Sequence, residues 1–166
     1  AQTEELRAKL FEKNALDAAV LAELHGGLDL TEKAKGPMIY VFALGTHTLE
    51  GGETVQIFKY GQSQNFAGRQ KTHESNFGSA GYDPRLIAAF PVANSVKAEA
   101  RIAEFLCCAG EAGSSLILTG FQCNGHTLKE IFHTSLEVPL IRIIAGIMKI
   151  AHECSTTSAY AAAIQE

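Results

Sequence analysis

“MIYVFAL” (38–44) and “TVQIFKY” (54–60) set the architecture expected for this chain of 166 residues. Both runs are short, apolar and rich in β-branched and aromatic side chains, and this pattern predicts two strands. The segment between them, “GTHTLEGGE”, carries the glycines of a turn. We therefore predict an antiparallel β-hairpin whose loop is somewhat longer than the shortest hairpin loops.

Helices and further strands are predicted on both sides of this hairpin. Leucines recur at helical spacing over 3–25, so residues 1–35 are expected to be an N-terminal helical extension. Residues 36–110 would form the core of the fold, and residues 111–166 would add a strand and a C-terminal helix that packs on it. The fold class is therefore expected to be α+β, with a small mixed sheet flanked by N- and C-terminal helices.

Two elements are expected directly after the hairpin. The pattern turns helical over 65–74, and “RLIAAFPVA” (85–93) suits a third strand. Proline cannot donate a ladder hydrogen bond, so Pro91 is expected at the end of that strand or at the edge of the sheet.

The C-terminal part of the chain predicts two helices and a strand. Asn94 or Ser95 is the expected N-cap of the first helix. “SSLILTGF” (114–121) is a candidate fourth strand, and “EVPLIRIIAGIMKIAHE” (137–153) predicts a long apolar helix. Such a helix must be buried, and a homodimer or a protein partner that covers its 136–152 stretch is one way to bury it.

Composition and charge place the chain in a broad class. A hydrophobic fraction of 46% and a charged fraction of 19% are typical of a globular domain. No apolar run reaches the roughly 20 residues of a membrane span, and the mixed charges at the start predict no signal peptide. We therefore expect a soluble, intracellular protein, with its compartment left open. The four cysteines have no zinc-site spacing, so we expect them to be buried reduced thiols.

The net charge of −4 is unevenly distributed along the sequence. Residues 59–101 hold six basic and three acidic residues, a local net charge of +3, so the rest of the chain carries −7. A basic segment between acidic ends is a weak indication of an anionic ligand.

The stretch “KYGQSQNFAGRQKTH” (59–73) carries the most specific pattern in the chain. It contains G-x-S-x-N-F-x-x-R, with a histidine four residues after the arginine. A tyrosine strand (“MIY”) precedes it, and “KAEARIAEFL” follows the third predicted strand. Over residues 36–108 this arrangement resembles the GIY-YIG nuclease superfamily. The later “TLKEIFHTS” resembles a viral and phage subgroup whose second motif reads lysine–hydrophobic–glycine.

This resemblance implies a metal-dependent endonuclease that hydrolyses DNA phosphodiesters. Glu99 would hold Mg²⁺ or Mn²⁺, and Arg69 would neutralise the phosphate. Tyr40 and His73 would orient or deprotonate the attacking water. Arg69 and His73 are four residues apart, so they share one face of the predicted helix.

Two positions leave alternatives open. The second tyrosine of the family aligns with Lys59, and Tyr60 takes the hydrophobic place that follows. Strand side chains alternate faces, so only one of the two can point into the site. Lys59 faces it if the alignment holds, and a slip of one residue reverses the assignment. Glu104 competes with Glu99 as the metal ligand, but the two lie about 140° apart around a helix.

A different class of function competes with the nuclease. A nuclease-derived domain that binds nucleic acid or a protein, without cutting, fits the acidic total charge and the lysine at position 59. The joint presence of Tyr40, Arg69, His73 and Glu99 favours the enzyme.

Overall fold

The computed structural model describes residues 4–24, 37–63, 77–78, 81–123, 125–136, 138 and 140–165. Residue 4 and the segments 22–24 and 155–165 are described by their backbone alone. The helix predicted over 65–74 lies outside the described residues.

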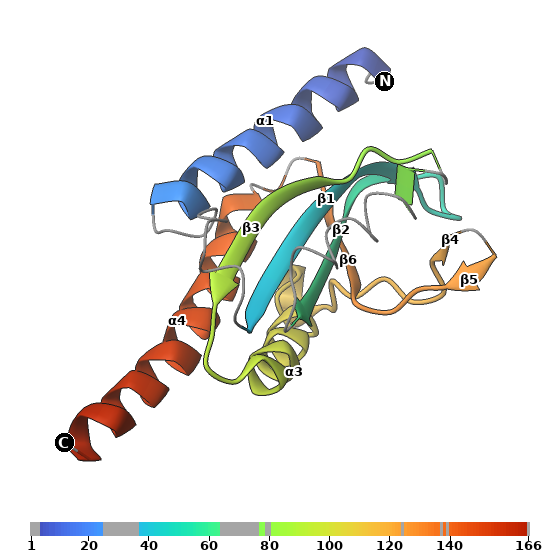
Figure 1. The fold of residues 1–166 in the computed structure, drawn as a ribbon. Coiled ribbons are helices and arrows are strands. Elements are labelled where there is room, and N and C mark those ends of the chain that lie inside the picture. The colour runs from blue at the N-terminus through green and yellow to red at the C-terminus, as the bar shows by residue number, and fades with distance from the viewer. Residues whose placement is uncertain are drawn as a thin grey trace.

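Four antiparallel strands form the main sheet, in the order β3-β1-β2-β6 (Figure 1). They are β1 (Met38–Thr48), β2 (Thr54–Ser63), β3 (Arg85–Pro91) and β6 (Ile131–Ser135). The predicted hairpin of β1 and β2 is confirmed. Its pairing continues to Thr48 and Thr54, so the loop consists of residues 49–53 and is, as expected, longer than the shortest hairpin loops. A mixed sheet was expected, but every described pairing is antiparallel.

Two short strands, β4 (Gln122–Cys123) and β5 (His126–Thr127), pair in a separate two-stranded sheet.

Pro91 is the last residue of β3, and β3 lies at the edge of the main sheet. Both placements were expected, because proline has no N–H group to donate to a neighbouring strand.

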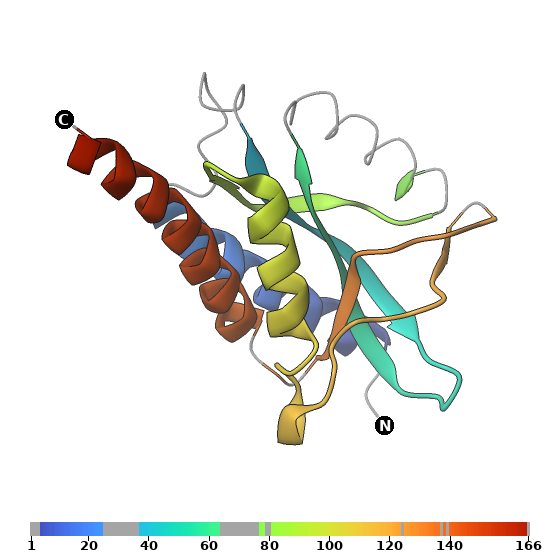
Figure 2. The same ribbon diagram turned by 90° about the horizontal axis from the view of Figure 1, so that it is seen from below.

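Helices α1 (Glu4–Leu24), α3 (Ser95–Leu106) and α4 (Leu140–Gln165) cover one face of the main sheet (Figure 2). Asn94 is the N-cap of α3, because its side-chain oxygen accepts a hydrogen bond of 3.0 Å from the Lys97 backbone N–H. A short 3₁₀ helix, η2 (Glu111–Gly113), follows α3. The α+β class and the flanking helices are thereby confirmed.

The main sheet has a hydrophobic core on each face. The helix-side core joins Ile39, Val41, Phe58 and Tyr60 of the hairpin to apolar residues of α1, α3 and α4. The far-side core contains the alternating hairpin residues, with Phe77, Phe121 and Cys123 packed among them: Met38, Tyr40, Phe42, Leu44, Val55 and Ile57. Because neighbouring strand residues point to opposite faces, the two sets interleave along the sequence.

Helix α1 packs into the helix-side core rather than standing apart from it. Phe11, Ala15 and Ala18 are buried there, and the rings of Phe11 and Phe58 are 6.4 Å apart at their centroids. The expected N-terminal extension is therefore, over its helical part, a layer of the same core.

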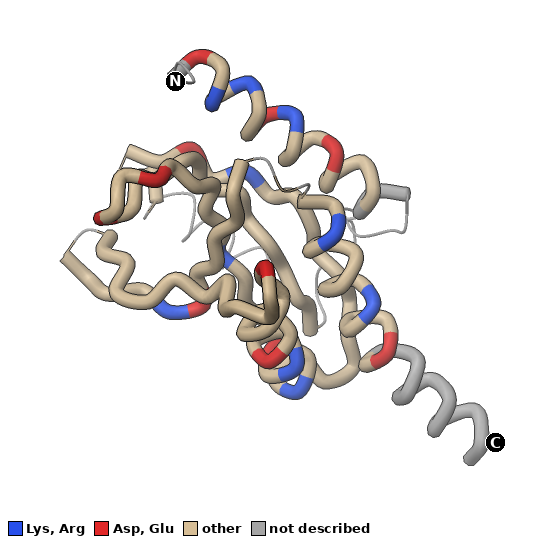
Figure 3. Tube along the Cα trace, turned by 180° about the vertical axis from the view of Figure 1, so that it is seen from behind, with Lys and Arg blue, Asp and Glu red and all other residues tan. Residues whose placement is uncertain are grey.

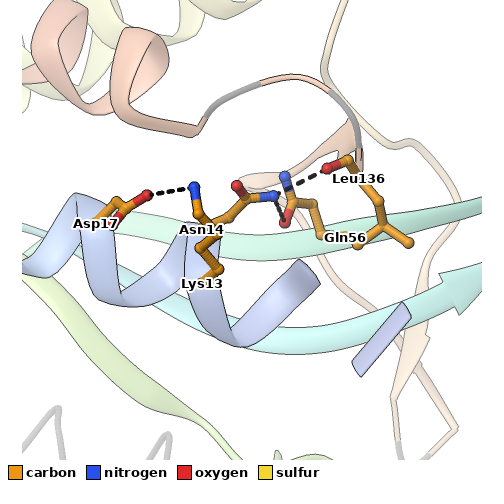
Figure 4. Close-up of polar contacts among 5 residues, drawn as sticks. All are labelled: Lys13, Asn14, Asp17, Gln56 and Leu136. Carbon is orange, nitrogen blue, oxygen red and sulfur yellow. Dashed lines mark hydrogen bonds and ion pairs between the residues drawn. The ribbon is translucent and has the colours of Figure 1, made fainter. Parts of the chain in front are cut away.

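A buried amide network fixes α1 against the sheet (Figure 4). Gln56 is fully buried, and its Oε1 accepts a hydrogen bond of 3.2 Å from Asn14 Nδ2. Its Nε2 donates to Thr134 Oγ1 at 2.7 Å, while Asn14 Nδ2 also donates to the Leu136 carbonyl at 3.0 Å. A buried polar group needs such partners, so the network favours this placement of α1 on the sheet.

The fourth strand is not where the sequence predicted it. Residues 114–121 contribute only an isolated bridge between Ile117 and Phe132, whereas β6 pairs with β2 over five residues. Ile131 and Phe132 are fully buried on opposite faces of the sheet, while Ile117 is only half-buried. The segment that buries apolar area on both faces takes the place beside β2.

The long apolar helix is buried within the chain itself. Seven residues of α4 belong to the helix-side core: Leu140, Ile143, Ile144, Ile147, Ile150, Ala151 and Cys154. The reason for expecting a dimer through this helix is therefore removed. No helix among the described residues is both long enough and apolar enough to cross a bilayer.

All four cysteines are free thiols. Cys123 and Cys154 are buried as expected, but Cys107 and Cys108 are exposed at the end of α3. The prediction of burial was wrong for this pair, because they follow the last helical residue and lie beyond the packed face.

Candidate functional site

Tyr40 and Lys59 lie on the same face of the hairpin. Tyr40 pairs with Gly61 and Phe42 pairs with Lys59, and directly paired residues of antiparallel strands share a face. Tyr40 and Phe42 both belong to the far-side core, so Lys59 projects to that side as well. The two candidates therefore stand on neighbouring strands, two pair positions apart.

The Tyr40 phenol lies directly over the backbone of Gly61. A Cβ atom at position 61 would be 2.6 Å from Tyr40 Oη and 2.8 Å from Tyr40 Cζ. These separations are shorter than any ordinary carbon contact, so the tyrosine needs a glycine opposite it. Tyr40 is 3% exposed. Tyr40 and Gly61 thus form one packing unit across the hairpin.

Tyr60 points to the opposite face. It belongs to the helix-side core, with its ring centroid 6.0 Å from that of Phe132. Burial raises the pKa of its phenol to about 12, and the negative charges of Glu130 and Glu99 add to the shift. Tyr60 therefore does not share a face with Tyr40. Of the two alternatives left open by the sequence, the register places Lys59, not Tyr60, beside Tyr40.

Lys59 is held by an acidic residue that the sequence analysis did not single out. Its ammonium group donates to Glu130 Oε2 at 3.0 Å and to the Lys129 carbonyl at 3.1 Å. The Lys59 side chain is 11% exposed and the Glu130 side chain 36%. Glu130 has a φ of +57°, a left-handed conformation that is rare for a residue with a Cβ. Neither the pairing nor this conformation has a signal in the local sequence.

Glu99 lies on α3, near the end of the hairpin where Tyr40 and Gly61 pair. Ser95 Oγ donates to Gln62 Oε1 at 2.8 Å and so fixes the first turn of α3 beside the last residues of β2. Glu99 follows one turn later, close enough to raise the pKa of Tyr60. Because α3 covers the helix-side face, Glu99 approaches the hairpin from the face opposite Tyr40.

Glu104 differs from Glu99 in its surroundings. Glu104 is exposed, whereas Glu99 is half-buried and acts electrostatically on Tyr60. Of these two carboxylates of α3, Glu99 is therefore the one that acts on a hairpin candidate.

Two candidates, Arg69 and His73, lie outside the described residues. Among the residues that are described, no group of three or more His, Cys, Asp or Glu side chains is arranged to hold a metal ion. The described candidates are divided between the two faces of the hairpin: Lys59 lies on the face of Tyr40, whereas Tyr60 and Glu99 lie on the side that the helices cover.

The basic segment 59–101 is partly neutralised in three dimensions. Arg85 donates to both carboxylate oxygens of Glu12, at 2.7 and 2.8 Å, and Arg101 pairs with Glu153. Lys59 pairs with Glu130. Figure 3 shows basic and acidic residues side by side along α1 and α4. The local excess of positive charge seen in the sequence is thus met by acidic residues from other segments, which weakens the indication of an anionic ligand.

No protein-family model, curated protein or solved structure matches the chain.

Proposed function

We propose that the chain is a metal-dependent endonuclease of the GIY-YIG kind, which hydrolyses DNA phosphodiester bonds. The observation that carries the proposal is the Tyr40–Gly61 unit, with Lys59 on the same face of an antiparallel hairpin. A helix after the third strand adds Glu99 at the same end of that hairpin, from the opposite face of the sheet. These elements occur in the order that the sequence motif requires.

Each candidate residue has a definite task in this reaction. Glu99 would hold one Mg²⁺ or Mn²⁺ ion, which polarises a phosphoryl oxygen and lowers the pKa of a water. Arg69 would neutralise the charge that develops on the phosphoryl oxygens. Tyr40 and His73 would orient the attacking water or accept its proton. Lys59 would contribute positive charge on the face of Tyr40.

One observation favours a second candidate function, binding of nucleic acid or protein without cleavage. Lys59 stands where the family has a tyrosine, and its ammonium group is already engaged by Glu130. The lysine nitrogen donates to the Glu130 carboxylate and to the Lys129 carbonyl, so these two acceptors, rather than a water, already occupy it. A site that lacks this base would still retain the surface on which the ligand binds.

The nuclease is tested by plasmid nicking at low salt with Mg²⁺ or Mn²⁺, with EDTA added in a parallel reaction. We expect Glu99→Gln to reduce nicking about 100-fold or more, because the charge that holds the metal is removed. Glu104→Gln is the rival variant on the same helix, and Glu111→Gln is the control for the loss of one surface charge.

The possible outcomes separate the hypotheses. Nicking that survives Glu99→Gln but is lost in Glu104→Gln would move the metal ligand to Glu104. Metal-independent nicking would refute the proposed mechanism. Binding of plasmid, branched or single-stranded DNA without any cleavage would support the second candidate function.

A further inference from the structure

The Lys59–Glu130 pair is unequal in its access to solvent. The lysine side chain is 11% exposed and is enclosed between Phe42 and Ile131, its neighbours on the adjacent strands. The glutamate side chain is 36% exposed. A buried ammonium group needs an anionic or strongly polar partner at all times, whereas a carboxylate at this exposure can be solvated by water. The glutamate can therefore leave the pair, while the lysine must stay.

The backbone of Glu130 has an unusual, left-handed conformation. A φ of +57° is strained for a residue that has a Cβ atom, and the protein retains this conformation at the residue that reaches Lys59. Tyr60 fixes the position of this turn, since its backbone N–H donates to the Glu130 carbonyl at 3.0 Å. Departure of the carboxylate thus requires a change of side-chain rotamer only, with the backbone held in place.

The Lys59 ammonium group has three N–H bonds, and within the described part of the chain two of them are used, by Glu130 and the Lys129 carbonyl. A tetrahedral anion can accept from such a group in place of the carboxylate.

We propose that Glu130 occupies, in the free protein, the place of a phosphate group on Lys59, and that a phosphodiester binds by displacing it. Glu130 is then an autoinhibitory residue, which keeps a buried cation neutralised until a nucleic-acid phosphate replaces it. The inference rests on the proposed function for the identity of the natural ligand. The anion site itself does not depend on cleavage.

The test uses the full chain and inorganic phosphate as the probe. Backbone amide NMR follows residues 59 and 129–131 during a phosphate titration of wild type, Glu130→Gln and Glu111→Gln. We expect Glu130→Gln to bind phosphate about tenfold more tightly than Glu111→Gln, because it removes a negative charge next to the Lys59 ammonium group. Both variants lose one negative charge, so their comparison cancels the change in net charge.

A second variant guards against poor folding of the first. Glu130→Gly removes the carboxylate and also relieves the left-handed strain, so it should bind phosphate as Glu130→Gln does. Adding Lys59→Met to Glu130→Gln should return phosphate binding to the wild-type level or below, because the cation is gone. A parallel anisotropy titration with duplex DNA should follow the same order.

The outcomes for this site and for the nuclease are independent. Equal phosphate affinity in Glu130→Gln and Glu111→Gln would overturn the displacement, even if the protein nicks plasmid DNA. Tighter binding that persists without Lys59 would also overturn it, because another cation would be responsible. Tighter, Lys59-dependent binding in a protein that cuts no DNA would support the displacement and refute the nuclease.

Discussion

Replacing Gly61 by alanine should destabilise the protein through a single contact. The new Cβ would lie 2.6 Å from Tyr40 Oη and 2.8 Å from Cζ, so the ring or the strand must move. Overpacking of this kind costs about 1–3 kcal/mol. Gly61 has no positive φ, so alanine gains about 0.4–1 kcal/mol from reduced freedom of the unfolded chain. The expected net loss of unfolding free energy is therefore about 0–2.6 kcal/mol, or about 1.3 kcal/mol at the midpoints of the two ranges.

A double-mutant cycle assigns that loss to the tyrosine. Tyr40→Val is destabilising by itself, but it removes the ring, so adding Gly61→Ala should then cost nothing. The expected coupling is about 1 kcal/mol or more, within the range found for residues in contact. Urea unfolding followed by far-ultraviolet circular dichroism measures all four proteins, since the sequence has no tryptophan.

Gly51→Ala is the matched control. Gly51 lies in the hairpin turn and has no positive φ, and a Cβ atom added there would meet no other atom within 4 Å. Alanine at this position should therefore leave stability unchanged or slightly higher. If Gly61→Ala were as stable as Gly51→Ala, or if its cost were the same with and without the Tyr40 ring, Tyr40 would not lie over Gly61. The central observation behind the proposed function would then be lost.

Three further predictions concern the rest of the fold. Gln56→Leu should lower the unfolding free energy by about 1–3 kcal/mol, as seen in urea unfolding, because buried Thr134 Oγ1 loses its donor. A double-mutant cycle of Glu12→Gln and Arg85→Met should give a coupling energy of at most about 1 kcal/mol, because both side chains of this bidentate pair are exposed. A larger coupling energy would show that the pair is shielded from solvent. Burial lowers the pKa of His133 below its ordinary 6.5, so below that pH the unfolded chain binds more protons at this residue than the folded protein does. The free energy of unfolding should therefore fall as the pH drops below about 6.5. Thermal unfolding of His133→Gln at several pH values should lack this loss.

The sequence predicted those elements that depend on only a few neighbouring residues. The hairpin followed from two apolar runs with glycines between them, and the start of α3 followed from Asn94. The sequence also showed that Lys59 and Tyr60 must face opposite ways. It could not show which of the two stands beside Tyr40, because that depends on a register set by pairing across the strands.

Features that depend on distant pairing were missed. β6 was not predicted, because it becomes a strand by pairing with β2, which lies more than seventy residues earlier in the sequence. A local pattern does not show such a pairing. Glu130 was missed for the same reason, since its importance comes from Lys59, 71 residues away. Gln56 reads as a polar interruption in an apolar strand, and only the approach of Asn14 and Thr134 explains its burial.

The contact between Asn14 and Leu136 joins positions 122 residues apart, and this separation shapes how the chain folds during synthesis. At about 5–20 residues per second, the ribosome needs on the order of ten seconds to progress from one to the other. The hairpin can form within microseconds of its emergence, but an isolated helix such as α1 is marginal in water. For those seconds, Phe11 and the apolar sheet face that it covers have no α4 to complete their core. The nascent chain therefore exposes apolar surface of α1 and of the sheet during this interval, and the docking of Asn14 must wait until Leu136 has been translated.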